Sequence, residues 1–341
     1  QPDLDGWSAL VQATLSGTQH GGTGGAGRIM VNAPIVEDVF AVRGVFVYRS
    51  DAGYIDNIGT GESNSNRTVT RSGRIMARWK PGPNTTVGYM YLEQSQTTDD
   101  AGFQNPLLGD LKKRTAFPDR GRFSTLIHNL RLDQDLGFAT LTATATYHRK
   151  RTLTRDDYSA SFSELLFGLA PVTSIAPSEN AGRTFEVRLA SAPGGRFDYV
   201  IGAMHDSTRI HITQQLFAEG MEAVVDGLFG PGIGALVAPD DLFLDGTLKG
   251  RARESALFGE ATYHFDDHLK VTLGGRLFDQ RLKLRSILKG LPIFLESGEP
   301  ATEIPGIQKS HGFNPKASIT WEEPDARTAL DAERPDDALT A

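Results

Sequence analysis

The sequence of 341 residues contains no cysteine, so it has neither disulfide bonds nor thiolate metal ligands. It has no apolar run of about 18 residues, which excludes a chain that crosses a membrane with helices. It also lacks an excess of basic residues, because 35 Lys and Arg stand against 42 Asp and Glu. This balance excludes the basic surface of a typical nucleic-acid-binding protein. A membrane β-barrel is compatible with all three absences, because a spanning strand is apolar on one face only.

The negative charge is concentrated in residues 322–341, where seven acidic residues stand against two basic ones. This segment is rich in alanine and has no alternating pattern, which is typical of a truncated or out-of-frame end. We therefore expect a folded part, 1–321, followed by an acidic irregular tail, 322–341. The first residue is Gln1, and nothing near it resembles a signal peptide, so we expect a mature or internal piece.

The main signal in the sequence is an alternation of apolar and polar residues. In residues 139–149, for example, Leu141 and Ala143 alternate with Thr142 and Thr144. A period of two indicates a β-strand with one apolar and one polar face, and runs of this length suit a tilted strand that crosses a bilayer. The pattern predicts twelve strands, at 6–16, 27–33, 39–49, 67–80, 85–94, 123–134, 139–149, 183–190, 196–209, 253–265, 269–281 and 313–321.

Short and long connections alternate strictly between these predicted strands. Short turns rich in Pro, Gly, Asn and Asp are followed by long polar segments, which we expect to be loops, at 50–66, 95–122, 150–182, 210–252 and 282–312. Apolar spacing within two of these loops, at 216–228 and 161–169, predicts short helices. Outer-membrane barrels have short turns at one end and long loops at the other. The sequence therefore predicts an all-β fold, a transmembrane antiparallel β-barrel.

The two faces of the predicted strands give two sets of candidate residues. Charged residues on the polar faces are expected to line the lumen, although pairing across neighbouring strands would explain them equally well. These candidates are Arg74, Arg78, Glu186, Arg188, Glu260, Lys270 and Arg276. Aromatic residues on strands are expected at the membrane interfaces, with ordinary sheet packing as the alternative. They are Trp7, Tyr48, Trp79, Tyr147, Tyr199, Tyr263 and Trp321.

Other motifs favour structural interpretations. The segment 22–27 matches the pattern G-x-G-x-x-G, but a strand that ends at Pro34 follows it instead of a helix, so we expect a flexible loop at the barrel rim. Acidic pairs such as Asp99 and Asp100 lack the ligand spacing of a calcium loop and are expected to be solvated. No arrangement of side chains indicates catalysis. We therefore expect no catalytic residue, no metal site and no cofactor, and a protein that is not an enzyme.

Several segments resemble the barrel of TonB-dependent outer-membrane receptors, in the family's own order over residues 1–321. The segments that carry the resemblance are QPDL at 1–4, VNAPIVED at 31–38, YRSDAGYIDN at 48–57, RWKP at 78–81, FGEATY at 258–263 and FNPKAS at 313–318. These motifs mark barrel positions and do not identify a ligand.

The resemblance implies a ligand-gated importer with a 22-stranded barrel around a plug. About twelve of those strands are present here, the plug is absent, and Gln1 resembles the position just after a plug. The implied solutes are siderophore-bound iron, haem, cobalamin or carbohydrate. The implied partners are outer-membrane lipid and the TonB complex, which would act through the absent plug. The implied location is the outer membrane of a Gram-negative bacterium.

Two alternatives stay open on the sequence. The chain could be a self-contained twelve-stranded porin or barrel enzyme, since an even strand number permits closure. It could instead be a soluble all-β binding or adhesive protein, although strands with apolar outer faces would then expose large apolar patches. No nucleic-acid partner is expected.

Overall fold

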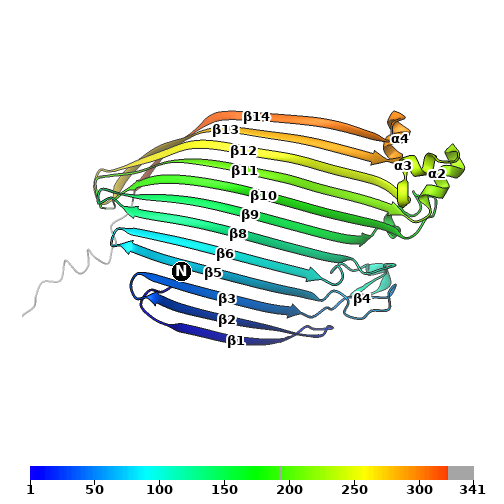
Figure 1. Cartoon of the computed structure of the whole chain (residues 1–341), viewed down its shortest axis with the longest axis horizontal. Helices are drawn as coiled ribbons and strands as arrows, with labels where there is room; N and C mark the ends of the chain where they lie inside the picture. The colour runs from blue at the N-terminus through cyan, green and yellow to red at the C-terminus, as the bar shows by residue number, and fades with distance from the viewer. Residues whose placement is uncertain (193, 322–341) are drawn as a thin grey trace, which may run out of the picture.

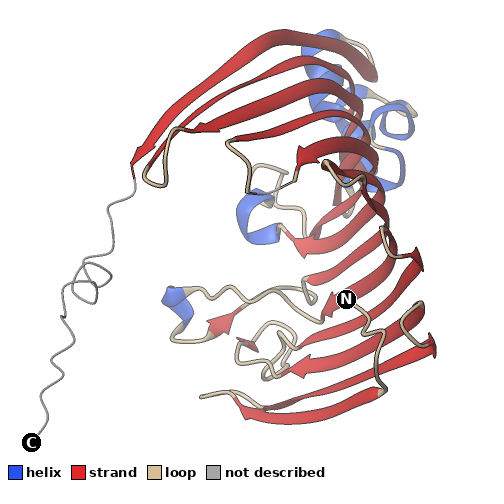
Figure 2. Cartoon of the chain, turned by 90° about the vertical axis from the view of Figure 1, so that its left-hand side faces the viewer, coloured by secondary structure: helices blue, strands red, loops and turns tan. Residues whose placement is uncertain are grey.

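The computed structural model describes residues 1–192 and 194–321, so the predicted tail 322–341 lies outside the described residues. Twelve strands form one antiparallel sheet in chain order, and the sheet curves into a trough (Figures 1 and 2). The strands are β1 (Ser8–Gly17), β2 (Thr23–Val36), β3 (Phe40–Asp51), β5 (Thr68–Gly82), β6 (Thr85–Thr98), β8 (Arg120–Asp135), β9 (Ala139–Asp157), β10 (Val172–Ser191), β11 (Phe197–Ala218), β12 (Leu242–His264), β13 (Leu269–Gly290) and β14 (Ala301–Trp321).

All twelve predicted strands are present, and the all-β barrel class is confirmed. The short predicted turns join neighbouring strands at one end of the sheet, and the longer connections lie at the other end (Figure 1). We call these the turn end and the loop end. Within the described residues, β1 and β14 are the two edges of the sheet and do not pair with each other. The twelve strands therefore form an open wall and not the closed twelve-stranded barrel considered above.

The predicted loops at 150–182, 210–252 and 282–312 are wrong over much of their length, because β9 to β14 continue far into them. For example, β12 begins at Leu242 instead of residue 253, and β14 begins at Ala301 instead of 313. The alternation that places apolar residues on the convex face ends where the apolar band of that face ends. Hydrogen bonds between the backbones of neighbouring strands continue beyond that point. They are made by backbone groups and therefore do not require an apolar side chain on either face.

The glycine-rich segment 22–27 is not a flexible loop. Residues Thr23 to Gly27 belong to β2 and pair with β1, and Gly25 to Gly27 also pair with β3. A Cβ atom at Gly24 would lie 2.8 Å from the carbonyl oxygen of Ser50, so this position requires the close backbone approach that glycine allows.

Short helices lie at the loop end of the sheet. They are α1 (Ser159–Phe162), α2 (Met221–Phe229), α3 (Ile233–Val237), α4 (Leu291–Ser297) and the single 3₁₀ turns η1 (Pro106–Leu108) and η2 (Pro239–Asp241). Helix α2 matches the later part of the prediction at 216–228, but residues 216–218 belong to β11 and 219–220 precede the helix. Helix α1 overlaps the helix predicted at 161–169 by only two residues. Helix α4 was not predicted and lies within the segment 282–312, which was predicted to be a loop. None of the described helices has both the length and the apolar character needed to span a membrane.

The largest buried apolar cluster joins these helices at the loop end of β10 to β13 (Figure 1). Val172 of β10, Ala218 of β11 and Leu291 of α4 meet Met221 and Val225 of α2, and all five side chains are buried. The sheet itself has few fully buried side chains. The structured loop end therefore has its own core, which holds the helices on the rim of the wall.

Candidate functional site

The sheet has two chemically different faces. The amino-terminal segment crosses the concave side of the trough (Figure 2), where Asn32 donates to the carbonyls of Asp3 and Gly6 and accepts from the Asp3 amide. Side chains alternate along a strand, so Ile29 and Val31, which are half exposed, lie on the convex face. The strand register assigns the residues of every other strand to the concave or the convex face in the same way.

The structure places all seven lumen candidates on this concave face, and their role in solute binding stays a prediction. Arg276 forms an ion pair with Glu254, and Lys316 Nζ lies 2.6 Å from Glu260 Oε2. The Nε of Arg78 is buried without a hydrogen-bond partner among the described residues. The candidates are spread over β5, β10, β12 and β13, so they line a broad concave surface and do not form one cluster.

Further ion pairs on the concave face occur near the turn end. Arg131 binds Asp133, which also accepts a hydrogen bond of 2.8 Å from Thr142, and His264 Nε2 lies 2.8 Å from Asp198 Oδ2. These pairs are partly exposed, so each contributes at most about 1 kcal/mol to stability. The face is therefore polar and hydrated. This suits a passage for a polar solute better than a packed interior.

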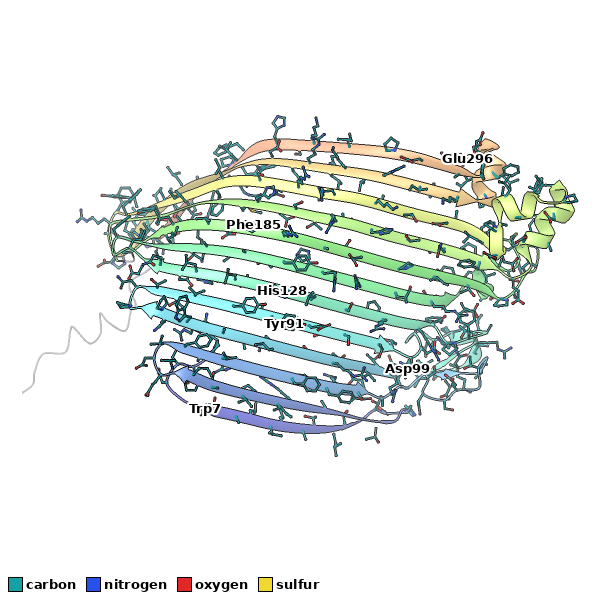
Figure 3. All side chains as sticks on the ribbon, in the orientation of Figure 1. Trp7, Tyr91, Asp99, His128, Phe185 and Glu296 are labelled. Atoms are coloured by element: carbon teal, nitrogen blue, oxygen red, sulfur yellow. The ribbon has the colours of Figure 1, made fainter. Side chains whose placement is uncertain are left out.

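The interface aromatics lie at two levels of the convex face, and their contact with lipid stays a prediction. Trp79, Tyr199, Tyr263 and Trp321 lie near the turn end, and Trp7 immediately precedes β1 at that end. Tyr48 and Tyr147 lie farther toward the loop end. Tyr147 joins a group that the sequence did not reveal, in which the His128 ring lies 5.2 Å from that of Tyr91 and 6.1 Å from that of Tyr147. Figure 3 labels Tyr91 and His128 on adjacent strands.

Two loops at the loop end fold together around a buried lysine. A short parallel pair, β4 (Asp56–Asn57) with β7 (Lys112–Lys113), joins the loop between β3 and β5 to the loop between β6 and β8. Lys113 is fully buried and forms ion pairs with Asp100 and Asp119, with 2.8 Å between Lys113 Nζ and Asp119 Oδ2. Asn57 donates to both Asp100 and Thr115. We call Lys113, Asp100, Asp119, Asn57 and Thr115 the loop lock.

The loop lock corrects the prediction that Asp99 and Asp100 are both solvated. Asp99 is exposed and pairs with Arg67 at 3.0 Å, but Asp100 is fully buried. The ring of Phe103 covers the Lys113 ammonium, with 4.5 Å between Nζ and the ring centroid. The sequence could not reveal this arrangement, since Asn57 and Thr115, which it brings into contact, lie 58 residues apart in the chain. Figure 2 shows both loops on the concave side of the wall, so the lock holds them over the lumen.

The pKa values of the two carboxyl groups in the loop lock are shifted in opposite directions. Burial pushes the pKa of Asp100 upward, but hydrogen bonds from Lys113, Ser65 and Asn57 outweigh it and hold that pKa below its usual value. Burial dominates at Asp119 and raises its pKa, although Lys113 partly opposes the rise. Asp119 therefore takes up a proton first as the pH falls, while the Asp100 pair with Lys113 persists.

This difference predicts a two-step response of the loops to acid. Protonation of Asp119 removes a penalised buried charge and leaves the lock closed, because a raised folded pKa favours the folded state at low pH. The stabilisation from Asp100 is present above its ordinary pKa of about 3.9 and is lost as the pH falls through its lower folded pKa. Hydrogen exchange of the amides in 99–119 should stay protected at about pH 4 and lose protection only well below it. Loss of protection already between about pH 6 and 5 would contradict this order.

A curved antiparallel sheet with an apolar convex band, a charged concave face and structured loops over one end defines the wall of a receptor barrel of the outer-membrane type. The family model described as TonB dependent receptor-like, beta-barrel, matches residues 54–339, and the chain belongs to this family. The family is one of receptors and transporters that bind small molecules and interact with TonB in the Gram-negative outer membrane, and it is not an enzyme family. No curated protein matches the sequence.

Solved structures of this kind share the fold. The ferric yersiniabactin uptake receptor FyuA from Yersinia pestis is similar at a TM-score of 0.75 and 14% identity, over 95% of this chain and 46% of that one. The ferric-catecholate import receptor Fiu from E. coli K12 is similar at 0.63 and 14%, over 95% and 53%. The siderophore receptor PiuA from Acinetobacter baumannii is similar at 0.60 and 12%, over 95% and 48%. The chain thus spans about half the length of these receptors.

Proposed function

We propose that residues 1–321 form part of the barrel of a TonB-dependent receptor in the outer membrane of a Gram-negative bacterium, and that this receptor imports a scarce solute. The observation that carries the proposal is the family match over residues 54–339. The loop lock supports it, because it holds two loops over the concave face, where an arriving solute would first meet the protein. Contact with the TonB complex is assigned to a plug domain outside this chain.

Siderophore-bound iron is the solute class we favour. The structures named above belong to a ferric yersiniabactin, a ferric-catecholate and a siderophore receptor. The concave face also presents Arg74, Arg78 and Arg188, and such cations favour an anionic solute. Haem, cobalamin and carbohydrate are the other classes that the proposal includes.

Iron uptake tests the proposal directly. Cells that lack their own siderophore receptors are supplied with radioactive ferric siderophores, with and without the protein. Uptake that depends on the protein and disappears when TonB is deleted is the expected result. Uptake that is unchanged by the loss of TonB would indicate passive flow, as in a porin, and would contradict the proposal.

The size of the protein in outer membranes provides a second test. An antibody raised against residues 99–118 should detect a band in purified outer membranes at about twice 37.0 kDa, since this chain covers 46% of the FyuA chain. A heat-modifiable band near 37.0 kDa would instead indicate a small closed barrel.

A further inference from the structure

The convex face of β9 to β14 carries an apolar band. The strand register defines rows of directly paired residues that cross the sheet, and residues of one row share a face. One such row contains Val187, Leu257, Leu277 and Phe313, which are all about half exposed or more. The next two rows toward the turn end are also almost entirely apolar or small. This band is the surface that faces lipid acyl chains in a barrel of this class.

Three rows on the loop side of this band have the opposite character. In order toward the band, they contain three, four and four Lys or Arg residues, and Glu179 is the only acidic residue among them. We call these eleven cations the basic belt. They are Arg151, Lys249 and Arg285; Arg149, Arg209, Arg251 and Lys283; and Arg183, Arg253, Arg281 and Lys309.

At the level of the belt, the charged residues of β10 to β14 lie on the convex face, while β9 also has a concave cation, Lys150. Concave positions that alternate with the belt residues include Ile210, Leu248, Gly250, Leu282 and Leu284. A strand that merely needed solubility above the membrane would carry charge on both faces and of both signs. Apolar and polar residues still alternate along β11 to β13, but the polar residues now lie on the convex face. The distribution indicates that something anionic lies against the outer surface.

Cations oppose cations across neighbouring strands of the belt. Arg209 pairs with Arg251, which pairs with Lys283, and Arg253, Arg281 and Lys309 form a second such series. Like charges directly opposite one another destabilise a sheet. Among the residues that the structure describes, only Arg151 and Arg285 of the belt form ion pairs, with Glu179 and Glu303. The Nε atom of Arg281 is buried and has no hydrogen-bond partner among the described residues. An external anion would relieve this repulsion.

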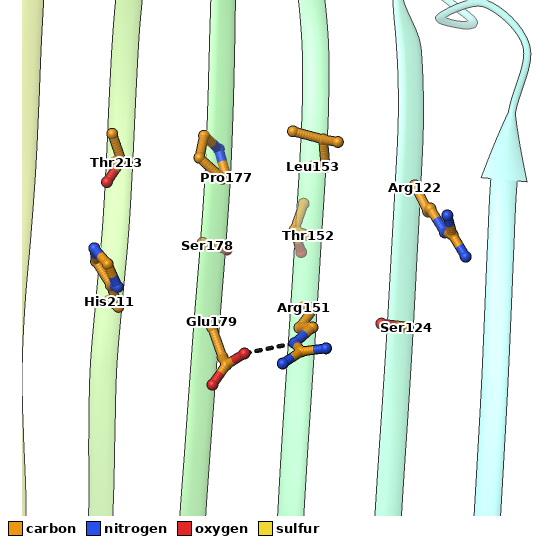
Figure 4. A pocket seen from close by; sticks show the side chains of 10 residues that line it. All are labelled: Arg122, Ser124, Arg151, Thr152, Leu153, Pro177, Ser178, Glu179, His211 and Thr213. Carbon is orange, nitrogen blue, oxygen red and sulfur yellow. Dashed lines mark hydrogen bonds and ion pairs between the residues drawn. The ribbon is translucent and has the colours of Figure 1, made fainter.

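A shallow hollow on the outer surface lies at the edge of the belt and includes the belt residue Arg151 (Figure 4). It lies across β8 to β11 and is lined by Arg122, Arg151, Glu179 and His211. Arg151 reaches Glu179, while Arg122 and His211 lie at the two sides of this pair. Ser124 and Thr213 add hydroxyl groups. Such a mixture of guanidinium, imidazole and hydroxyl groups suits a phosphorylated sugar, because arginine binds phosphate oxygens and hydroxyls bind sugar hydroxyls.

We infer that the basic belt binds the phosphate groups of a multiply phosphorylated glycolipid in the membrane leaflet at the loop end. One mixed row separates the belt from the apolar band, so a lipid whose acyl chains pack on the band places its headgroup at the level of the belt. This row contains Ala145, Phe185, His205, Ser255, Asp279 and His311. The inference uses the outer-membrane location proposed above, but it does not depend on the imported solute. Binding of the lipid orders the convex surface of β9 to β14 and offsets the repulsion among the cations.

The test compares two variants of the detergent-extracted protein, each with four exposed cations changed to glutamine. The belt variant carries Lys249→Gln, Arg251→Gln, Arg253→Gln and Lys283→Gln. The matched control carries Arg28→Gln, Lys112→Gln, Arg114→Gln and Arg196→Gln, which also lie at exposed positions but outside the belt. The probe is lipid A, an acylated disaccharide with two phosphates, presented in phosphatidylcholine vesicles. Heat-modifiable mobility in gels establishes that each variant is folded.

The belt variant is expected to bind these vesicles at least about 30-fold more weakly than the control, because each cation near an anionic lipid surface strengthens binding about fivefold. Equal binding by the two variants would overturn the inference. Full competition by inorganic phosphate would also overturn it, since it would indicate a site for free anions. If the belt variant does not fold, the salt dependence of vesicle binding by the unmodified protein is the test. This binding must weaken steeply between about 0.05 and 0.5 M salt, and binding that salt does not weaken would overturn the inference. Iron uptake in the same cells reports separately on the proposed function.

Discussion

Replacing Lys113 with methionine is expected to destabilise the loop lock by about 3–5 kcal/mol, because the substitution leaves two buried carboxylates without their cation. Lys113 is fully buried between Asp100 and Asp119, and methionine has a similar length without the charge. The two loops should then separate while the sheet stays intact. Limited proteolysis within 52–67 and 99–119 and hydrogen exchange of the same segments measure the change.

Lys112 provides the matched control for this experiment. It is the preceding residue of β7, but its side chain is exposed, so Lys112→Met should change the protection of the loops very little. If Lys113→Met and Lys112→Met have the same effect, the buried ion pairs do not hold the loops. The double change of Asp100 and Asp119 to asparagine, made together with Lys113→Met, should recover part of the lost stability, since it removes the uncompensated charge.

Introducing arginine at Val187 is expected to lower the free energy of unfolding by about 2–4 kcal/mol in lipid vesicles, as arginine does on the lipid face of a barrel near the membrane midplane. Val187 lies in the apolar band and is 49% exposed, so we expect the exposed half of its side chain to contact lipid. The loss is measured by urea unfolding, with gel mobility as the probe for the folded barrel.

The control for Val187→Arg uses the other face at the same depth. Thr144 pairs directly with Glu186, the neighbour of Val187, and both lie on the concave face. Thr144→Arg places the new cation beside a carboxylate in a hydrated passage and should cost less than about 1 kcal/mol. Equal losses from Val187→Arg and Thr144→Arg would show that the convex face is not in lipid.

The sequence predicted the turn end of the sheet far better than the loop end. Leu269 begins β13 as expected and Ala139 begins β9 as expected, since the apolar alternation starts directly after each tight turn. The strand predicted from residue 183 begins instead at Val172. Beyond the apolar band the polar residues of these strands move to the convex face, so the periodicity that predicts the strands is interrupted there while backbone pairing continues.

The parts of the site that depend on distant contacts were not predictable. The Lys113 ammonium is neutralised by Asp100 and Asp119, and a lysine in a polar loop gives no sign of burial before the loops are folded. The basic belt was visible only as scattered arginines until the register aligned them. By contrast, the face of each lumen candidate followed from the alternation alone, and its role in binding a solute stays a prediction.

The unequal lengths of the strands have a consequence for how a solute arrives. Strand β1 has 10 residues and β12 has 23. At about 3.3 Å per residue these are about 33 Å and about 76 Å long, so the rim of the wall is oblique. The tall side near β12 carries the helices, and the locked loops lie toward the low side (Figure 1). In the receptor proposed above, we therefore expect a bulky solute to enter at an angle, over the shorter strands of this part of the wall.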